Sequence, residues 1–204
     1  MNIVLDFDGT IVGCEARQMS VLSAVLLRHG LRVDLKSVWN FKRSGLNTRD
    51  ALVLAGFSFG QSAEIQSAWA DEVEGLGWLQ LDQLLPGVRE VLGEWIKSGH
   101  RLTLLSARTR GEWLACQVKN LGIMEYFNSI VCVEPSQADT RKAAALREAA
   151  ATFFVGDTES DWRAATLAEV GFFAVCTGQR SEAFLRSQTN ATIAQQLGQL
   201  FKNE

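Results

Sequence analysis

Five short and almost uninterrupted apolar segments constrain the fold of this 204-residue chain more than any other feature. They cover residues 2–6, 101–106, 129–134, 152–156 and 171–176. Continuous apolar runs of this length are typical of strands buried on both faces of a parallel sheet. Helical periodicity lies between several of them, so the sequence predicts an open α/β fold built from βαβ units.

The helices of this fold are predicted over residues 87–98, 140–150, 159–169 and 190–201. The first is the clearest, because its apolar residues fall on one helix face and Pro86 and Gly99 flank it. The last rests on the spacing of Ile193, Leu197 and Leu200, which predicts a terminal helix packed against the core.

Residues 14–82 interrupt the alternation of strands and helices. This region shows three helical patterns and no convincing strand. The pattern predicts an all-helical cap inserted directly after the first strand and its loop. The α/β core would then consist of residues 1–13 and 83–204.

Chemically capable side chains lie where the predicted strands end. They are Asp6 and Asp8 after the first strand, Ser106 after the second, Lys142 at the start of the helix after the third, and Asp157 after the fourth. The carboxyl ends of parallel strands meet at one edge of a sheet, where open α/β proteins bind their ligands. We therefore expect these five side chains to converge on one site.

These residue types suit phosphoryl transfer. Asp6 is a candidate nucleophile, and Asp8 can protonate a leaving group and later deprotonate a water. Two neighbouring carboxylates repel each other unless a cation lies between them. Asp157 adds a third oxygen ligand, and three such ligands suit Mg²⁺. Ser106 and Lys142 would hold the anionic phosphoryl group.

Some of these residues also have a purely structural interpretation. Asp8 and the glycine after it form a turn dipeptide, although a turn does not explain Asp6. Ser106 is a candidate helix cap. However, Thr109 and Glu112 predict a capping box for the next helix, which leaves Ser106 free for another role.

Lys142 can be interpreted as a solvated helix residue. With Asp139 or Thr140 as the N-cap, it would lie in the first helical turn, where the helix dipole disfavours a cation. That local cost favours a functional role. Arg141 shares the same position and is the rival candidate for it.

The segments DFDGT at 6–10 and GDTESD at 156–161, with Ser106 and Lys142 between them, resemble the four ordered motifs of the haloacid dehalogenase-like superfamily. The resemblance covers nearly the whole chain. It implies a Rossmann-like core with three α/β/α layers. The helical insert resembles the cap of the phosphoglycolate phosphatase and β-phosphoglucomutase branch.

The resemblance also implies residue roles. Asp6 would form an aspartyl-phosphate and bind Mg²⁺, and Asp8 would be the general acid/base and touch the metal through its backbone carbonyl. Asp157 would complete the metal site, and Asp161 would support it from behind. A second aspartate two residues after the nucleophile is similar to phosphatases and mutases of the superfamily, whereas its true dehalogenases lack it.

The sequence departs from the family pattern at one motif. Many relatives carry Asn after the hydroxyl residue of the second motif, but here Ala107 stands there, followed by Arg108. The cap segment 41–52 resembles the part that contacts substrate in β-phosphoglucomutase-like proteins. Arg43 or Arg49 is therefore a candidate for recognising the leaving group, with a solvated cap arginine as the alternative.

Three functions agree with this set of residues. The first is a Mg²⁺-dependent phosphatase that hydrolyses a small phosphorylated metabolite through an aspartyl-phosphate. The second is a phosphomutase that uses the same intermediate. The third is a phospho-aspartate signalling or binding module, although such modules place the acceptor on a later strand and lack a helical cap.

Composition narrows the partners. The net charge is −3 and no basic run is present, so we expect no nucleic-acid partner. No apolar run reaches the length of a membrane span, and no signal peptide is visible, which predicts a cytoplasmic protein. The four cysteines form no CxxC pair and only two histidines are present, so a zinc site is not expected.

The oligomeric state is left open between monomer and homodimer. Three of the six tryptophans, Trp39, Trp69 and Trp78, fall in the cap. Large aromatic side chains are usually buried, so packing inside the cap is favoured over a place at a substrate entrance or a dimer contact.

Overall fold

A six-stranded parallel sheet forms the centre of the molecule in the computed structural model, which describes residues 1–200. The strands are β1 (Asn2–Leu5), β4 (Arg101–Ala107), β5 (Ser129–Val133), β6 (Phe153–Gly156), β7 (Gly171–Val175) and β8 (Thr192–Ala194). Their order across the sheet is β5-β4-β1-β6-β7-β8. This is the order of a Rossmann-like fold, and the five strands predicted from the apolar segments are confirmed.

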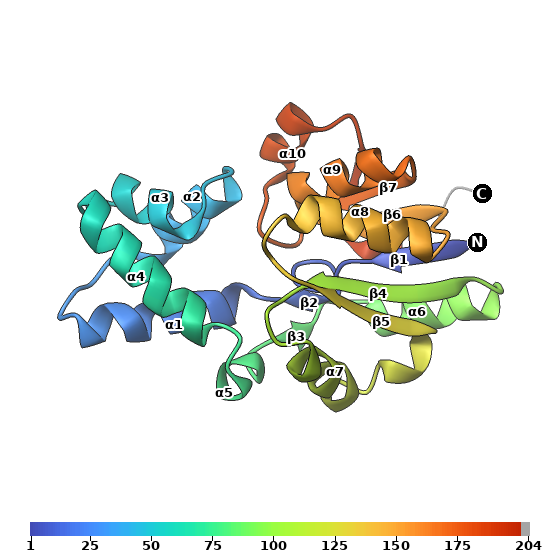
Figure 1. The fold of residues 1–204 in the computed structure, drawn as a ribbon, viewed down its shortest axis with the longest axis horizontal. Helices are drawn as coiled ribbons and strands as arrows, with labels where there is room; N and C mark the ends of the chain where they lie inside the picture. The colour runs from blue at the N-terminus through green and yellow to red at the C-terminus, as the bar shows by residue number, and fades with distance from the viewer. Residues whose placement is uncertain (201–204) are drawn as a thin grey trace.

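Helices cover both faces of this sheet, as Figure 1 shows. They are α6 (Val88–Lys97) and α7 (Gly111–Asn120) on one face, and α8 (Ala138–Glu148) and α9 (Glu159–Ala168) on the other. Side chains of β1 alternate between them: Ile3 and Leu5 join the apolar cluster of α6 and α7, while Val4 joins that of α8 and α9. The three-layer α/β/α architecture is thereby confirmed.

A separate group of helices lies beside the sheet (Figure 1). It contains α1 (Glu15–Arg28), α2 (Leu35–Arg43), α3 (Thr48–Leu54), α4 (Phe59–Glu72) and α5 (Leu76–Leu79). Its apolar core is its own and includes Leu22, Trp39, Leu52 and Ile65, with Trp69 and Trp78 packed against it. Within residues 1–200, no helix combines the length and the apolar character needed to cross a bilayer.

Two short strands connect this helical group to the sheet. β2 (Val12–Gly13) precedes α1 and pairs antiparallel with β3 (Gln83–Leu84), which follows α5. A two-stranded ribbon therefore carries the chain out of the core and back. We propose it as the boundary between the core and a cap of residues 14–82.

The prediction of a helix over 190–201 is wrong for residues 190–200. Residue 201 lies outside the described part of the chain. The chain forms β8 there, which pairs with β7, and then the 3-10 helix η2 (Leu197–Gln199). Ile193 packs near the short helix α10 (Glu182–Gln188), whereas Leu197 joins the cluster below α6. Pairing with the open edge of β7 therefore determines the structure here more than the helical spacing does. Ile193 and Leu197 consequently pack in two different apolar clusters.

Candidate active site

The candidate site lies at the carboxyl ends of β1, β4 and β6. The chain runs from β1 to β4 and β5 on one side, and then returns to β6 on the other side of β1. Such a switch point leaves a crevice in which open α/β proteins bind ligands. A cavity of about 180 Å³ occupies this place. It is lined by all six residues predicted for the core site: Asp6, Asp8, Ser106, Lys142, Asp157 and Asp161.

Lys142 joins two carboxylates at the floor of this cavity. Its ammonium nitrogen Nζ donates to Asp6 Oδ1 at 2.6 Å and to Asp161 Oδ1 at 2.7 Å. Arg141, the rival candidate, is exposed and donates to the carbonyl of Ser136 instead. Lys142 is therefore the cation that the structure places next to Asp6.

Lys142 lies at the cavity, but the prediction that it occupies the first turn of its helix is wrong. Helix α8 begins at Ala138 with Gln137 at the N-cap, so Lys142 is its fifth residue and lies in the second turn. The dipole acts mainly within the first turn, and its cost at this position is small. The two carboxylates, rather than the helix, determine where this ammonium points.

The carboxylates of the site form a cluster with an excess of negative charge. Oxygens of Asp6, Asp157 and Asp161 all lie within 4.8 Å of one another. Burial raises the pKa of Asp6 to about 7, although Lys142 opposes it. Burial, and then the neighbouring Asp6, raise the pKa of Asp157 well above its ordinary value. One ammonium does not balance three buried carboxylates, so the cluster favours a further cation.

Asp157 has an oxygen that suits a metal ion. Its Oδ2 accepts the backbone N–H of Gln179 at 2.6 Å. Its Oδ1 is buried and has no hydrogen-bond partner among residues 1–200. A buried carboxylate oxygen without a donor is costly unless a cation contacts it. Oxygen ligands in a small polar cavity are those that Mg²⁺ prefers, so the residues fit this ion.

Gly9 allows the loop after β1 to approach Asp157. Its φ of +82° lies in the left-handed region. A Cβ at this position would also overlap the Asp157 carboxylate and lie 2.7 Å from the Cα of Gly178. Only glycine satisfies both conditions. The turn interpretation of the Asp8–Gly9 pair is thus confirmed, and it is compatible with a functional role for Asp8, which stays a prediction.

Ser106 lies within β4, almost fully buried, and its neighbour helix does not begin as predicted. The capping box of Thr109 and Glu112 is wrong, since α7 starts at Gly111 without a side-chain cap. The carboxylate of Glu74 instead accepts the backbone N–H groups of Thr109 and Arg110 at 3.1 to 3.2 Å. Glu74, near the end of the cap, therefore accepts backbone N–H groups at the start of α7, where the sequence predicted a local capping box.

A true capping box is present at α9. The hydroxyl of Thr158 accepts the backbone N–H of Asp161 at 3.2 Å, and the Asp161 carboxylate accepts the backbone N–H of Thr158 at 3.2 Å. Asp161 therefore binds Lys142 with one oxygen and caps its own helix with the other. Its position in the site is fixed from both sides.

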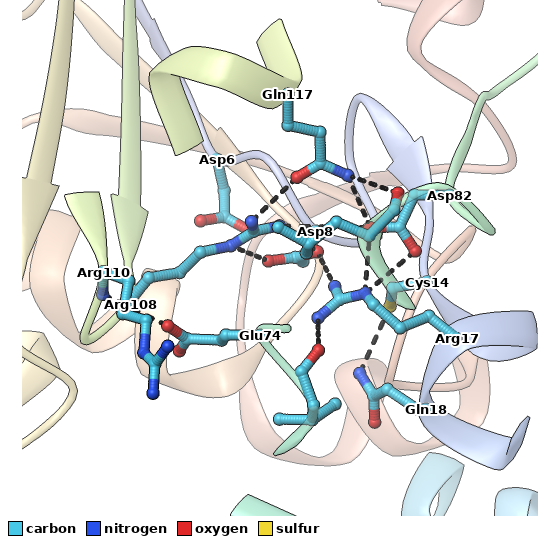
Figure 2. A network of polar contacts seen from close by, with 12 residues as sticks. Asp6, Asp8, Cys14, Arg17, Gln18, Glu74, Asp82, Arg108, Arg110 and Gln117 are labelled. Atoms are coloured by element: carbon cyan, nitrogen blue, oxygen red, sulfur yellow. Dashed lines mark hydrogen bonds and ion pairs between the residues drawn. The ribbon is translucent and has the colours of Figure 1, made fainter. Parts of the chain in front are cut away.

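Asp8 is held by two arginines, as Figure 2 shows. Arg108 donates from Nε to Asp8 Oδ2 at 2.9 Å and from Nη2 to Asp8 Oδ1 at 2.8 Å. Arg17, on helix α1 of the cap, also forms an ion pair with Asp8 Oδ1. Burial would raise the pKa of Asp8, but Arg108 and Arg17 outweigh this effect and hold it below its usual range.

Sequence reasoning missed three members of this network: Arg17, Asp82 and Gln117. Arg17 did carry a signal, because it precedes Val21 by four residues and so lies on the buried face of α1. Asp82 and Gln117 showed no such pattern. Arg108 was noted only as a departure from the family motif, and its partner was not predicted.

The two candidate cap arginines lie in different places. Arg43 donates to the carbonyl of Cys176 at 2.9 Å and so connects the cap to the loop after β7. Arg49 pairs with Asp50 at 3.0 Å, and its guanidinium lies 4.9 Å from the ring centre of Phe59. Neither lines the cavity that holds Asp6. The structure therefore brings Arg43 to the cap–core boundary and keeps Arg49 within the cap.

Comparison with protein families gives a match to the model described as "Haloacid dehalogenase-like hydrolase" over residues 3–175. This chain belongs to the haloacid dehalogenase-like hydrolase family. The match begins in β1, covers residues 14–82 in full and ends with β7. A comparison of the sequence with curated proteins found no match.

Solved structures agree with this assignment at the level of the fold. A haloacid dehalogenase-like hydrolase from Streptococcus pneumoniae has a TM-score of 0.77 and 20% identity, covering 98% of this chain and 96% of its own. A predicted phosphoglycolate phosphatase from Haemophilus somnus has a TM-score of 0.68 and 16% identity, with coverages of 94% and 92%. Protein Tyrosine Kinase A from Mycobacterium tuberculosis has a TM-score of 0.74 and 19% identity, with coverages of 97% and 94%.

These neighbours share the fold over nearly their full length. Their names differ in the reaction, since one is called a phosphatase and another a kinase. The fold alone therefore does not determine which reaction a member catalyses. The reaction depends on the side chains of the site.

Proposed function

We propose that this protein is a Mg²⁺-dependent phosphatase that hydrolyses a small phosphorylated metabolite through an aspartyl-phosphate on Asp6. The observation that carries the proposal is the pairing of Asp6 with Lys142 beside the unpartnered Oδ1 of Asp157. The three residues line one cavity, which supports their proposed roles as nucleophile, cation for the phosphoryl oxygens and metal ligand.

The chain's own residues supply each part of the reaction. In the first half, the Asp6 carboxylate bonds to phosphorus as the bond to the leaving oxygen breaks. Asp8 must enter this step protonated, against the influence of Arg108 and Arg17 on its pKa, and it gives that oxygen its proton. In the second half, Asp8 takes a proton from the water that attacks phosphorus, and the bond to Asp6 breaks. One ester and one water become one alcohol and one phosphate. Ser106 and Lys142 hold the phosphoryl oxygens throughout.

Asp6, Asp157 and the main-chain carbonyl of Asp8 would hold the Mg²⁺. When bound, the ion neutralises charge on the phosphoryl group and between the carboxylates. Asp161 supports the site through Lys142. Closure of the cap over these groups would exclude water during the first half-reaction.

The test is phosphate release from p-nitrophenyl phosphate by the purified protein, with Mg²⁺ and with EDTA. We expect activity that requires the metal and is lost in Asp6→Asn. The matched control is Asp34→Asn, because Asp34 caps α2 on the exposed cap surface and Asn is an equally good N-cap. Activity that survives both EDTA and Asp6→Asn would exclude the proposal.

Two further outcomes separate the alternatives. Conversion of a sugar 1-phosphate to the 6-phosphate, without release of inorganic phosphate, would identify a phosphomutase. A phospho-enzyme that persists for hours without turnover would identify a signalling module. Mass spectrometry of the intact protein, after mixing with substrate, distinguishes this last case from a short-lived intermediate.

A further inference from the structure

A short loop, residues 176–181, connects β7 to α10 on the side of the sheet that faces the cap (Figure 1). It has no regular secondary structure. Its two ends contact the cap, and its middle contacts Asp157 in the candidate site. The loop therefore joins two parts of the molecule that are far apart in the sequence.

Three hydrogen bonds attach this loop to the end of helix α2 in the cap. Arg43 Nη2 donates to the carbonyl of Cys176 at 2.9 Å, and the backbone N–H of Ser181 donates to the carbonyl of Arg43 at 2.9 Å. Arg180 Nη1 donates to the carbonyl of Lys42 at 3.0 Å. Both ends of the loop are thus attached to two consecutive cap residues.

Side-chain packing supports the same attachment. Gly45 follows α2 with a φ of +105°, and a Cβ at this position would lie 2.2 Å from the ring of Phe184 in α10. The guanidinium of Arg180 lies 5.6 Å from the centre of that ring. It also pairs with Glu159 of α9 at 2.7 Å. The cap is therefore closely packed against the loop as well as hydrogen-bonded to it.

The middle of the loop holds Asp157. The backbone N–H of Gln179 donates to Asp157 Oδ2 at 2.6 Å. Gly178 packs directly against the same carboxylate, because a Cβ at this position would lie 2.0 Å from Oδ2. The hydroxyl of Thr177 donates to the carbonyl of Gly9 at 2.5 Å. The loop thus fixes both the carboxylate and the turn after β1 that approaches it.

These contacts determine which oxygen of Asp157 is available to a cation. Oδ2 is occupied by Gln179, and Oδ1 has no partner among residues 1–200. Hydrogen-bond partners that orient a metal ligand commonly change metal affinity by about ten- to a hundredfold when they are lost. The position of Gln179 is therefore relevant to the affinity of the proposed Mg²⁺ site.

We propose that residues 176–181 couple the position of the cap to the binding of Mg²⁺ at Asp157. Arg43 is a positioning residue in this device, because it fixes the loop and the loop orients Asp157 through Gln179. When the cap detaches, the loop relaxes and the ion is bound more weakly. Such coupling is reciprocal, so the bound ion also strengthens the attachment of the cap. The inference rests on the proposed Mg²⁺ site.

Charge and coupling predict opposite effects of removing Arg43. By Coulomb attraction alone, the loss of a positive charge strengthens the binding of a cation nearby. Loss of the attachment between loop and cap weakens it. Weaker Mg²⁺ binding in Arg43→Met would therefore reflect the coupling and not the change in charge.

The experiment is a calorimetric titration of the protein with MgCl₂ at pH 7, without substrate. We expect the dissociation constant for Mg²⁺ to rise about tenfold in Arg43→Met. A partial loss of folded protein changes the stoichiometry rather than this constant. Arg32→Met is the matched control, because Arg32 is an exposed cap arginine between α1 and α2. It should leave the constant unchanged.

Amide hydrogen exchange measures the reciprocal effect. The N–H of Ser181 donates to the cap, so its exchange reports the attachment of the loop. We expect MgCl₂ to slow this exchange in the wild type and to slow it less in Arg43→Met. The N–H of Ala51, which donates to the carbonyl of Asn47 within the cap, is the control for general stabilisation. Equal slowing at both amides would contradict a specific coupling.

The outcomes separate this inference from the proposed function. If Arg43→Met does not fold, Arg180→Met carries the test, because it loses the contact with Lys42 and also removes a positive charge. A folded variant that binds Mg²⁺ as tightly as the wild type, or more tightly, overturns the inference and leaves the phosphatase function standing. A wild-type protein that binds no Mg²⁺ overturns the proposed metal-dependent function, and the inference with it.

Discussion

The sheet edge of the core and the interior of the cap each bury a lysine, and the two lysines are treated in opposite ways. Lys142 lies between the carboxylates of Asp6 and Asp161. Lys42, on α2, donates to Gln18 Oε1 at 2.6 Å and to Thr48 Oγ1 at 2.9 Å, and its ammonium lies 4.6 Å from the ring centre of Trp69.

Their pKa values move in opposite directions for this reason. Burial lowers the pKa of a lysine in both places. At Lys142 the charges of Asp161 and Asp6 outweigh it and raise the pKa above its ordinary value. At Lys42 no carboxylate among residues 1–200 opposes it, and burial lowers the pKa to about 7. A buried ammonium is thus stabilised where carboxylates contact it, and is costly where its hydrogen-bond partners are neutral.

The largest expected effect comes from removing Lys142. Lys142→Met leaves Asp6 and Asp161 without their cation, so we expect the free energy of unfolding to fall by about 3 kcal/mol. Phosphate release should fall about a hundredfold or more, because the phosphoryl oxygens lose their ammonium. Urea denaturation and a phosphate assay, both at pH 7 with Mg²⁺, measure the two effects.

The exposed Lys119→Met, on α7, serves as the control for this substitution. We expect its free energy of unfolding to stay within about 0.5 kcal/mol of the wild type. A similarly small change for Lys142→Met would mean that the ion pairs with Asp6 and Asp161 contribute little in solution.

Lys42 gives an intermediate effect that depends on pH. Its pKa of about 7 in the folded protein lies below the ordinary value of 10.5, so the unfolded chain binds more protons throughout this interval. The stability contributed by this residue therefore rises with pH between the two values. We expect wild type to gain about 1 to 3 kcal/mol relative to Lys42→Met between pH 7 and 9.5.

Urea denaturation of both proteins across this range measures the difference. Lys36→Met, on the exposed side of the same helix, should run parallel to the wild type. The informative quantity is how the stability difference between wild type and Lys42→Met changes with pH. A difference that is the same at every pH reflects the lost contacts with Gln18 and Thr48 instead. Parallel curves for wild type and Lys42→Met would show that the ammonium reaches water.

The smallest effects compare the same capping motif in the two regions. Thr158 caps α9 in the core and Ser58 caps α4 in the cap, each through a capping box. Thr158→Ala and Ser58→Ala should each cost about 1 kcal/mol. Only Thr158→Ala should also lower phosphate release, because it frees Asp161, which positions Lys142.

Thermal denaturation and the phosphate assay test this pair together. Ser58→Ala is the control, since α4 lies in the cap and Ser58 is exposed. If the two variants keep equal activity, Asp161 does not depend on its capping contacts for its position beside Lys142.

Much of the core could be predicted from local patterns. The strands β1, β4, β5, β6 and β7 are continuous apolar runs, and such runs are determined by burial on both faces. Strand β8 could not be predicted in this way. Thr192–Ala194 becomes a strand because the edge of β7 is open to it, and that edge is formed by residues about twenty positions earlier.

The candidate site also contains some features that the sequence predicts and others that it does not. Asp6, Asp8 and Asp157 follow strands, so their meeting at one sheet edge follows from parallel topology. The capping box at Thr109 failed because Glu74 of the cap occupies the backbone donors there. The contacts of Arg17 and Arg108 with Asp8 join positions far apart in the chain, and no periodicity within one segment connects them.

The sequence by itself determined the parallel α/β core, the helical insert and the acidic residues at the strand ends. Burial periodicity and strand direction are local properties, and they suffice for these features. Only the tertiary structure decided which charges neutralise one another. The strength of an ion pair depends on separation in space and on burial. Both were decided when helix α1 placed Arg17 against Asp8, while Lys42 on α2 has no carboxylate partner among residues 1–200.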